Sequence, residues 1–364
     1  MSGTDHQHQY TPRHETLHLA DMQRRPAFLT RWERTRHRGA HWFVECFAEF
    51  LGVFLYCYAG IGSTAAWILG GFVGEELGSL FTVGFAYAIG IVLALVICSA
   101  TSGGHLHPAI TIVMTLFKGF PPLKAVRYII AQILGAYVAC LIIYLQWKHI
   151  IVTVEDALIA SGTFDTVMFQ PTGPAGIFAL YATTGSSLGL ILINEFVVDF
   201  VIGLTIFACL DPTNFFCPPA AAPWVIAFVY AIAVWGYSPV GLAANPARDI
   251  GARLMAITIW GLKASGGRYA AIAGLTSIPA TVCSFLCYEF MFVDSSRVVP
   301  GPNRAWLEGH KAHLEHVENT HMYPNGTSTV TSHAGLPTIG HASSPDLEGK
   351  AHESRSEVTG HSKA

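Results

Sequence analysis

His107-Pro108-Ala109 and Asn245-Pro246-Ala247-Arg248-Asp249 are short segments that nearly repeat each other in the two halves of the chain. In each segment a proline directly follows a polar residue. This is a helix-start signal, because proline lacks the N–H that would be unsatisfied at that position. Both segments lie beside long apolar runs. Non-helical backbone survives at membrane depth only where protein buries it or where it lines a watery cavity. Two such interruptions in matching halves indicate a path for a solute.

The composition is that of a membrane protein. Of the 364 residues, 52% are hydrophobic and 12% are charged, and the mean hydropathy of +0.43 is too high for an ordinary soluble protein. The net charge of −3 is small and no basic stripe is present, so we expect no nucleic-acid partner. The cysteines lie within or beside apolar runs, which favours packing over disulfides or a metal site.

Six apolar runs are each close to the length that crosses a bilayer. Arginines gather before the first run, and this basic flank predicts a cytoplasmic N-terminus. Six crossings return the C-terminus to the same side, and Lys118, Lys124 and Arg127 then also lie inside. The predicted spans are approximately 42–64, 79–101, 125–147, 188–210, 222–239 and 269–291.

The sequence predicts three regions. Residues 1–40 are polar and are expected to form a disordered cytoplasmic N-terminal tail. Residues 41–291 hold all six apolar runs and form the membrane domain. Residues 292–364 are rich in histidine and polar residues without apolar periodicity, and are expected to be a disordered cytoplasmic C-terminal tail.

The two halves form an inverted repeat. Glu49 in the first run and Glu195 in the fourth occupy matching positions, each ahead of one of the two motifs. Because three crossings per half is an odd number, the second half enters the membrane from the opposite side. The fold class that follows is an all-α integral membrane protein with six transmembrane helices and two re-entrant half-helices.

The two half-helices bring their N-termini together near the midplane. Each N-terminus carries roughly half a positive charge, and the pair repels cations and protons while leaving neutral solutes alone. Arg248 can donate hydrogen bonds to solute oxygens; the alternative is a structural arginine paired with a carboxylate. Glu49 and Glu195 are interpreted as anchors for loop backbone, with proton relays as the alternative. His105 is expected to pack or to anchor its loop. Asp199 and Glu45 have no matching partner and receive no role.

These residues resemble the major intrinsic protein family, the aquaporins and aquaglyceroporins. The segment from Ser102 to Thr111 is similar to the first family signature, with His107 in place of asparagine, and the segment from Gly241 to Arg248 is similar to the second. Glu49 and Glu195 match the family's glutamates. The resemblance covers about 42–291, so the region 41–291 is identified as an aquaporin-like channel domain, and it implies a homotetramer with one pore per subunit.

The resemblance also implies a selectivity filter, which the family places at set offsets from the two motifs. Those offsets select Tyr87, Ala233, Leu242 and Arg248. Water-selective members usually have histidine where this chain has Ala233, and alanine leaves more room. Typical glycerol facilitators have tryptophan at the Tyr87 position and an aromatic residue at the Leu242 position. Asp249, Arg253 and Pro279 resemble the glycerol-conducting members.

The function predicted from these observations is a passive channel for glycerol, water and other small neutral solutes, located in the plasma membrane. No nucleotide-binding loop is present, and we expect no cofactor and no enzyme activity. His107 and Asn245 are expected to orient the solute at the centre, together with the adjoining Pro108, Ala109, Pro246 and Ala247 of the two motifs.

Two other functions stay open at this point. One is a proton-coupled secondary transporter, since inverted repeats also build those. The other is a non-conducting adhesion or junction protein on the same scaffold. His107 itself admits two interpretations: a neutral imidazole that faces the solute, or one that turns away and bonds to loop backbone.

Overall fold

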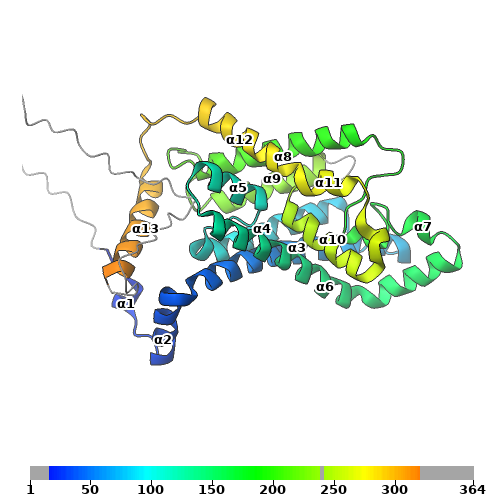
Figure 1. Ribbon diagram of the computed structural model, residues 1–364, viewed down its shortest axis with the longest axis horizontal. Helices are drawn as coiled ribbons and strands as arrows, with labels where there is room; N and C mark the ends of the chain where they lie inside the picture. Colours follow the sequence, from blue (N-terminus) through cyan, green and yellow to red (C-terminus); the bar gives the residue numbers. More distant parts are fainter. Residues whose placement is uncertain (1–15, 238–241, 320–364) are drawn as a thin grey trace, which may run out of the picture.

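The computed structural model describes residues 16–237 and 242–319, and within that part of the chain every regular element is helical (Figure 1). The elements are α1 (Leu19–Met22), α2 (Ala27–Thr35), the π-helix η1 (Arg36–Ala40), α3 (His41–Val73), α4 (Leu80–Ser102), α5 (Pro108–Phe117), α6 (Pro122–Ala160), α7 (Phe164–Val167), the 3-10 helix η2 (Pro174–Ile177), α8 (Leu188–Leu210), α9 (Ala222–Gly236), α10 (Pro246–Trp260), the 3-10 helix η3 (Gly261–Ser265), α11 (Tyr269–Leu275), α12 (Ser277–Met291) and α13 (Gly301–Asn319).

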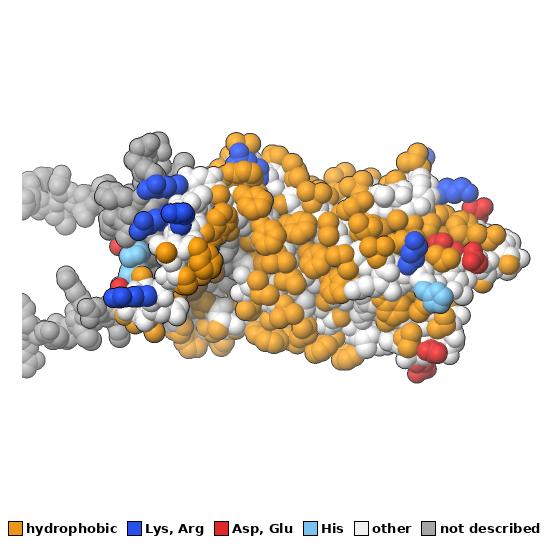
Figure 2. Space-filling view, turned by 90° about the horizontal axis from the view of Figure 1, so that it is seen from below, with side chains coloured by type: hydrophobic (Ala, Val, Ile, Leu, Met, Phe, Trp, Pro, Cys, Tyr) orange, Lys and Arg blue, Asp and Glu red, His pale blue; other side chains and the backbone are white. Residues whose placement is uncertain are grey.

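Each predicted apolar run coincides with a helix. Five helical segments of the described chain are long and apolar enough to cross a membrane: α2 with α3, α4, α6, α8, and α11 with α12. The helix α9 is apolar but has 15 residues, and residues 238–241 after it lie outside the described part. Figure 2 shows a broad band of hydrophobic side chains, with most charged side chains toward the two ends. The protein is therefore an integral, multi-pass membrane protein.

Proline explains where several helices begin or break. Pro108 and Pro246 occupy the first positions of α5 and α10, where a missing N–H costs nothing. Pro122 begins α6 in the same way. The last span divides into α11 and α12 at Thr276, and Pro279 follows in the first turn of α12, because proline cannot donate the helical hydrogen bond to the preceding turn.

The two halves of the chain pack by the same scheme. The helix α3 packs against α4 and α6, α8 packs against α9 and α12, and α10 joins the halves by packing against α6. Figure 1 shows α5 near the end of the molecule that carries α2 and α13, and α10 toward the end that carries α7; we call these the α2 end and the α7 end. Close approach needs small residues: a methyl group on Gly135 of α6 would meet the Phe50 carbonyl of α3 at 2.3 Å.

The described parts of both tails differ from the expected disorder. The N-terminal tail contains α1, α2 and η1, and η1 leads without a gap into α3. The C-terminal tail contains α13, which ion pairs four residues apart support, Arg304 with Glu308 and Lys311 with Glu315. The expectation missed α13 because charged and histidine residues obscure its pattern. Residues 1–15 and 320–364 of the two predicted tails lie outside the described part.

Candidate functional site

The two motif residues start their half-helices with the same geometry. His107 and Asn245 are the N-caps of α5 and α10, with backbone angles φ/ψ of −156/120° and −157/116°. The His107 Nδ1 atom accepts a hydrogen bond from the Ala109 backbone N–H (3.1 Å), and the Asn245 Oδ1 atom accepts one from the Ala247 N–H (2.9 Å). Each side chain thus satisfies one of the free N–H groups at a helix start. Histidine replaces asparagine here without loss of the cap.

The residue before each cap holds a left-handed backbone conformation. Leu106 has φ 49° and Ala244 has φ 55°, and they are the only non-glycine residues with positive φ in the described chain. The conformation costs about 1–2 kcal/mol for an ordinary side chain. It presents the two carbonyl groups to the opposite loop: Asn245 Nδ2 donates to the Leu106 carbonyl (2.9 Å), and His107 Nε2 donates to the Ala244 carbonyl (3.0 Å). The two loops are therefore joined by reciprocal hydrogen bonds.

These contacts fix the state of the His107 ring. Because a backbone N–H can only donate, Nδ1 must be the unprotonated nitrogen, and the proton must be on Nε2, which faces a carbonyl oxygen. The Ser277 hydroxyl lies 3.4 Å from the same Nε2 atom. Both ring nitrogens thus bond to loop backbone, which is the alternative interpretation of His107. Asn245 differs, since its amide nitrogen has a second N–H beyond the one given to Leu106.

Glu49 binds the backbone of the first loop. Its Oε1 atom accepts hydrogen bonds from the Ser102 hydroxyl (2.6 Å) and the His105 N–H (3.0 Å). Its Oε2 atom accepts from the Leu106 N–H (2.7 Å) and the Gln132 amide (2.7 Å). The carboxylate is fully buried, and its four donors come from α4, the loop and α6. These four hydrogen bonds hold Leu106 in its left-handed backbone conformation, and they are the contacts that an anchoring role requires.

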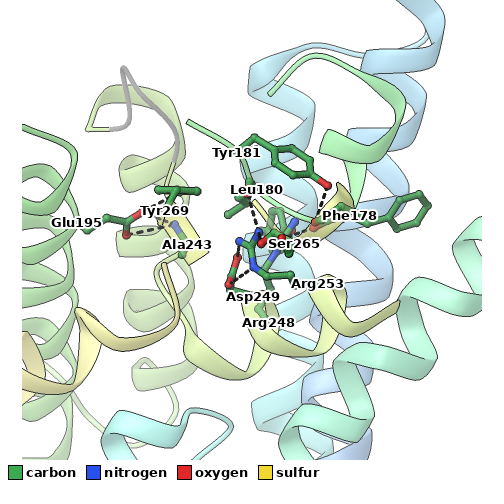
Figure 3. Close-up of polar contacts among 12 residues, drawn as sticks. Phe178, Leu180, Tyr181, Glu195, Ala243, Arg248, Asp249, Arg253, Ser265 and Tyr269 are labelled. Atoms are coloured by element: carbon green, nitrogen blue, oxygen red, sulfur yellow. Dashed lines mark hydrogen bonds and ion pairs between the residues drawn. The ribbon is translucent and has the colours of Figure 1, made fainter. Parts of the chain in front are cut away.

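Glu195 makes the matching contacts in the second half, and Figure 3 shows it facing Ala243 and Tyr269. The Ala243 N–H lies 2.9 Å from Oε1 and 3.2 Å from Oε2, and the Tyr269 hydroxyl donates to Oε1 at 3.2 Å. The side chain is 1% exposed. The second anchor thus holds the residue before the left-handed Ala244, with fewer donors than Glu49 has.

Arg248 has acceptors that carry no charge. Its Nε donates to the Tyr87 hydroxyl (3.1 Å) and its Nη1 to the Phe178 carbonyl (2.7 Å). No carboxylate pairs with Arg248 among the described residues, because the neighbouring Asp249 is bound to Arg253 instead. A guanidinium has five N–H donors, so Arg248 retains donors that no described protein acceptor takes. The structure does not place Arg248 in the alternative role of an ion-pair partner.

The other two predicted filter residues, Ala233 and Leu242, both lie in the second half of the chain. Ala233 is fully buried in α9, and Leu242 is partly buried three residues before Asn245. Both pack in the apolar cluster that contains Val229 and Ala244. Tyr87 and Arg248 touch each other, whereas Ala233 and Leu242 share this cluster, so the four-residue filter stays a prediction.

Asp249 and Arg253 form an ion pair that holds two loops beside α10. Arg253 binds the carboxylate through Nη2 (2.5 Å) and Nε (3.0 Å). Its Nη1 donates to the carbonyls of Leu180 and Ser265, at 3.1 and 3.0 Å. Figure 3 shows the pair beside the Arg248–Phe178 contact. The loop between α7 and α8 is thus held by two arginines of α10 through its backbone oxygens.

Several residues of the site were not predicted. Gln132 was detectable as a polar residue within an apolar run, and Ser277 could be recognised in the same way. The carbonyls of Phe178 and Leu180 carry no sequence signal, since any residue has one. Buried Glu45, which received no role, binds Lys124 (2.7 Å) and His41 (3.1 Å) at the α2 end. The described residues contain no group of three or more His, Cys, Asp or Glu able to hold a metal.

Comparisons with known proteins point to one family. The sequence profile of the family described as Major intrinsic protein matches residues 37–263. The chain is 51% identical over 312 residues to Aquaporin-3 of Laccaria bicolor, covering 84% of this chain and 94% of that protein. It is 32% identical over 230 residues to the glycerol uptake facilitator protein of Pseudomonas aeruginosa, covering 62% of this chain and 79% of the relative.

The fold is also similar to a solved structure. The X-ray structure of the aquaglyceroporin from Plasmodium falciparum superposes with a TM-score of 0.57 and covers 69% of this chain and 96% of that chain. The sequences are 20% identical, so this likeness concerns the fold alone. It agrees with the packing of two halves around α5 and α10.

Proposed function

This chain belongs to the major intrinsic protein family, and from that premise we propose that it is a passive channel for glycerol, water and other small neutral solutes that excludes ions and protons. The relatives carry the names aquaporin and glycerol uptake facilitator protein. Members of such a channel family are not enzymes.

The reciprocal bonding of the two motif loops is the observation that carries this proposal. The bonds from His107 to Ala244 and from Asn245 to Leu106 hold the N-termini of α5 and α10 against each other. Each N-terminus contributes about half a positive charge, which opposes cations and protons. The second N–H of Asn245 is the donor we assign to a passing oxygen at the centre, and we assign His107 to holding the loops.

The filter residues support glycerol as a solute. Arg248 keeps donors that can bind hydroxyl or water oxygens. Ala233 offers only a methyl group where a histidine would narrow the path, and Leu242 adds an apolar wall. A molecule with one hydroxylated edge and one hydrocarbon edge suits such a lining.

Purified protein in proteoliposomes tests the function directly. Stopped-flow light scattering with water and glycerol gradients in parallel should show fluxes that rise with the amount of protein, and no ionic current. Glycerol flux equal to that of empty liposomes, or a current proportional to channel number, would overturn the proposal. Glycerol accumulation driven by a pH gradient would favour the proton-coupled transporter. A flat response to both gradients would favour the non-conducting junction protein.

Ala233→His should separate glycerol from water. A buried imidazole narrows the filter, and we expect glycerol flux to fall about tenfold or more while water flux changes far less, because a pocket discriminates by size on that scale. Ala233→Gly is the matched control, since it changes the same position without narrowing it. An equal loss of both fluxes in Ala233→His would argue against this filter position.

The tails should be dispensable for permeation. The cross-loop bonds and the anchors lie within residues 49–269, so a protein trimmed to about residues 38–295 should keep its flux per channel. Flux must be divided by the measured number of channels in the membrane, since the tails can affect delivery. A trimmed channel that reaches the membrane but conducts poorly would refute this prediction.

We also propose the location and assembly. Basic residues gather at the α2 end, which places that end in the cytoplasm by the positive-inside rule, and α2 and α13 lie there together (Figure 1). Both termini are then cytoplasmic. A homotetramer in the plasma membrane is the assembly that the family resemblance implies. Cross-linking in membranes and protease protection of the two tails test these statements.

A further inference from the structure

The helix α2 and the start of η1 carry an arginine-lined hollow that no other described element lines. Arg31 and Arg34 of α2 and Arg38 of η1 are spaced three and four residues apart, and all three face this hollow. The hollow measures about 430 Å³. We call it the α2 hollow; it is lined by Ala27, Thr30, Arg31, Arg34, Thr35 and Arg38.

The positive charge of the α2 hollow is not neutralised within the described chain. The one acidic residue of α2, Glu33, binds Arg25 at 2.8 Å. No salt bridge reaches Arg31, Arg34 or Arg38 from any described residue. Three guanidinium groups thus surround a space that contains no carboxylate. An anion in this space would meet both charge and hydrogen-bond donors.

Aromatic side chains lie next to these arginines on the same helix. Phe28 is 70% exposed and Trp32 is 50% exposed. Exposed aromatic rings of this size are typical of the boundary between lipid tails and headgroups. Trp42, in the first turn of α3, is also half exposed, and the Arg127 guanidinium lies 5.3 Å from its ring. Exposed aromatic rings and arginines therefore lie together on α2, at the end of the molecule where Figure 2 shows Lys and Arg side chains beyond the hydrophobic band.

We propose that the α2 hollow binds the phosphate headgroup of an anionic phospholipid in the leaflet at the α2 end. Phe28 and Trp32 enter the acyl boundary, and Arg31, Arg34 and Arg38 contact the headgroup. Arginine suits this ligand because its planar fork binds phosphate oxygens in pairs. The aromatic neighbours distinguish a lipid from a soluble phosphate, since only a lipid brings a hydrocarbon surface to Phe28 and Trp32. The inference is independent of which solute the channel conducts.

Lipid retention by the full-length protein tests this site. The protein is reconstituted in phosphatidylcholine vesicles containing phosphatidylserine, extracted in mild detergent, and its bound phospholipids are counted by mass spectrometry. Wild type should be enriched in phosphatidylserine over the vesicle composition. Arg31→Gln/Arg34→Gln/Arg38→Gln should weaken this preference by about a hundredfold, since each arginine near an anionic surface contributes about a factor of five. Inorganic phosphate at millimolar concentration should not displace the lipid.

A matched variant controls for charge. Arg297→Gln/Arg304→Gln/Lys311→Gln removes the same number of positive charges from the C-terminal segment and should retain the lipid. Circular dichroism spectra and thermal unfolding in detergent that match the wild type show that both variants fold. Trp32→Phe gives a second measurement: brominated phosphatidylserine should quench the fluorescence of wild type more than that of this variant. Equal retention by both triple variants, displacement by free phosphate, or identical quenching would each overturn the proposal.

Discussion

Glu49→Gln should release the first motif loop and nearly abolish flux. Glutamine keeps one acceptor oxygen and replaces the other by an amide donor. Two of the four groups that bind Glu49 then lose their acceptor, either Leu106 N–H and the Gln132 amide or Ser102 OH and His105 N–H. An unsatisfied buried donor costs about 1–3 kcal/mol, so the two together cost about 2–6 kcal/mol. Even the lower figure changes the equilibrium between anchored and released loop more than tenfold.

Glu195→Gln is the matched control for Glu49→Gln. The Ala243 N–H and the Tyr269 hydroxyl both reach Oε1 of Glu195, so glutamine can keep both of these donors on its one oxygen. The second contact of Ala243 with Oε2 and a backbone hydrogen bond from Ala244 are the contacts at risk, fewer than the four donors that bind Glu49. We therefore expect a smaller loss of water and glycerol flux and of thermal stability in detergent. Stopped-flow measurements on both variants give the flux, which is divided by the number of channels in the membrane and then compared between the two variants. Equal effects of the two substitutions would show that the hydrogen-bond geometry of Glu49 does not set its importance.

Acid should slow permeation because it protonates His107. Histidine is the side chain that titrates nearest to neutrality. A second proton can only enter at Nδ1, where it would face the Ala109 N–H that Nδ1 now accepts. Protonation would thus break the cap of α5 and add a positive charge between two helix N-termini. Burial opposes this added charge, so we expect water and glycerol flux to stay constant near neutral pH and to fall several-fold only at about pH 4 or below.

His107→Asn supplies the control for the acid effect. Asparagine can cap α5 as Asn245 caps α10, and it does not titrate in this range. The variant should conduct at neutral pH and lose the acid response. If it keeps the same acid response, the titrating group lies elsewhere, for example in the histidine-rich C-terminal region. A wild-type flux that does not change with pH would also contradict the prediction.

The sequence was sufficient to predict where the helices of the membrane domain lie and which class of protein they form. Apolar runs of spanning length are local properties of the chain, and each run forms a helix in the structure. Pro108 and Pro246 mark the starts of α5 and α10 because the cap and the missing N–H are also local. The tail helices were missed, since α13 depends on ion pairs and a weak pattern instead of an apolar stripe.

Tertiary structure decided which groups meet at the centre. The sequence placed Glu49 and Glu195 in matching positions, but Gln132 and Tyr269 reach them only through helix packing. A histidine at position 107 can likewise donate and accept hydrogen bonds, but its residue type does not decide where its nitrogens point. The left-handed turns at Leu106 and Ala244 decide this, because they aim two backbone carbonyls at the opposite loop. Backbone oxygens have no residue code, so contacts made to them become visible only when the fold brings distant segments together.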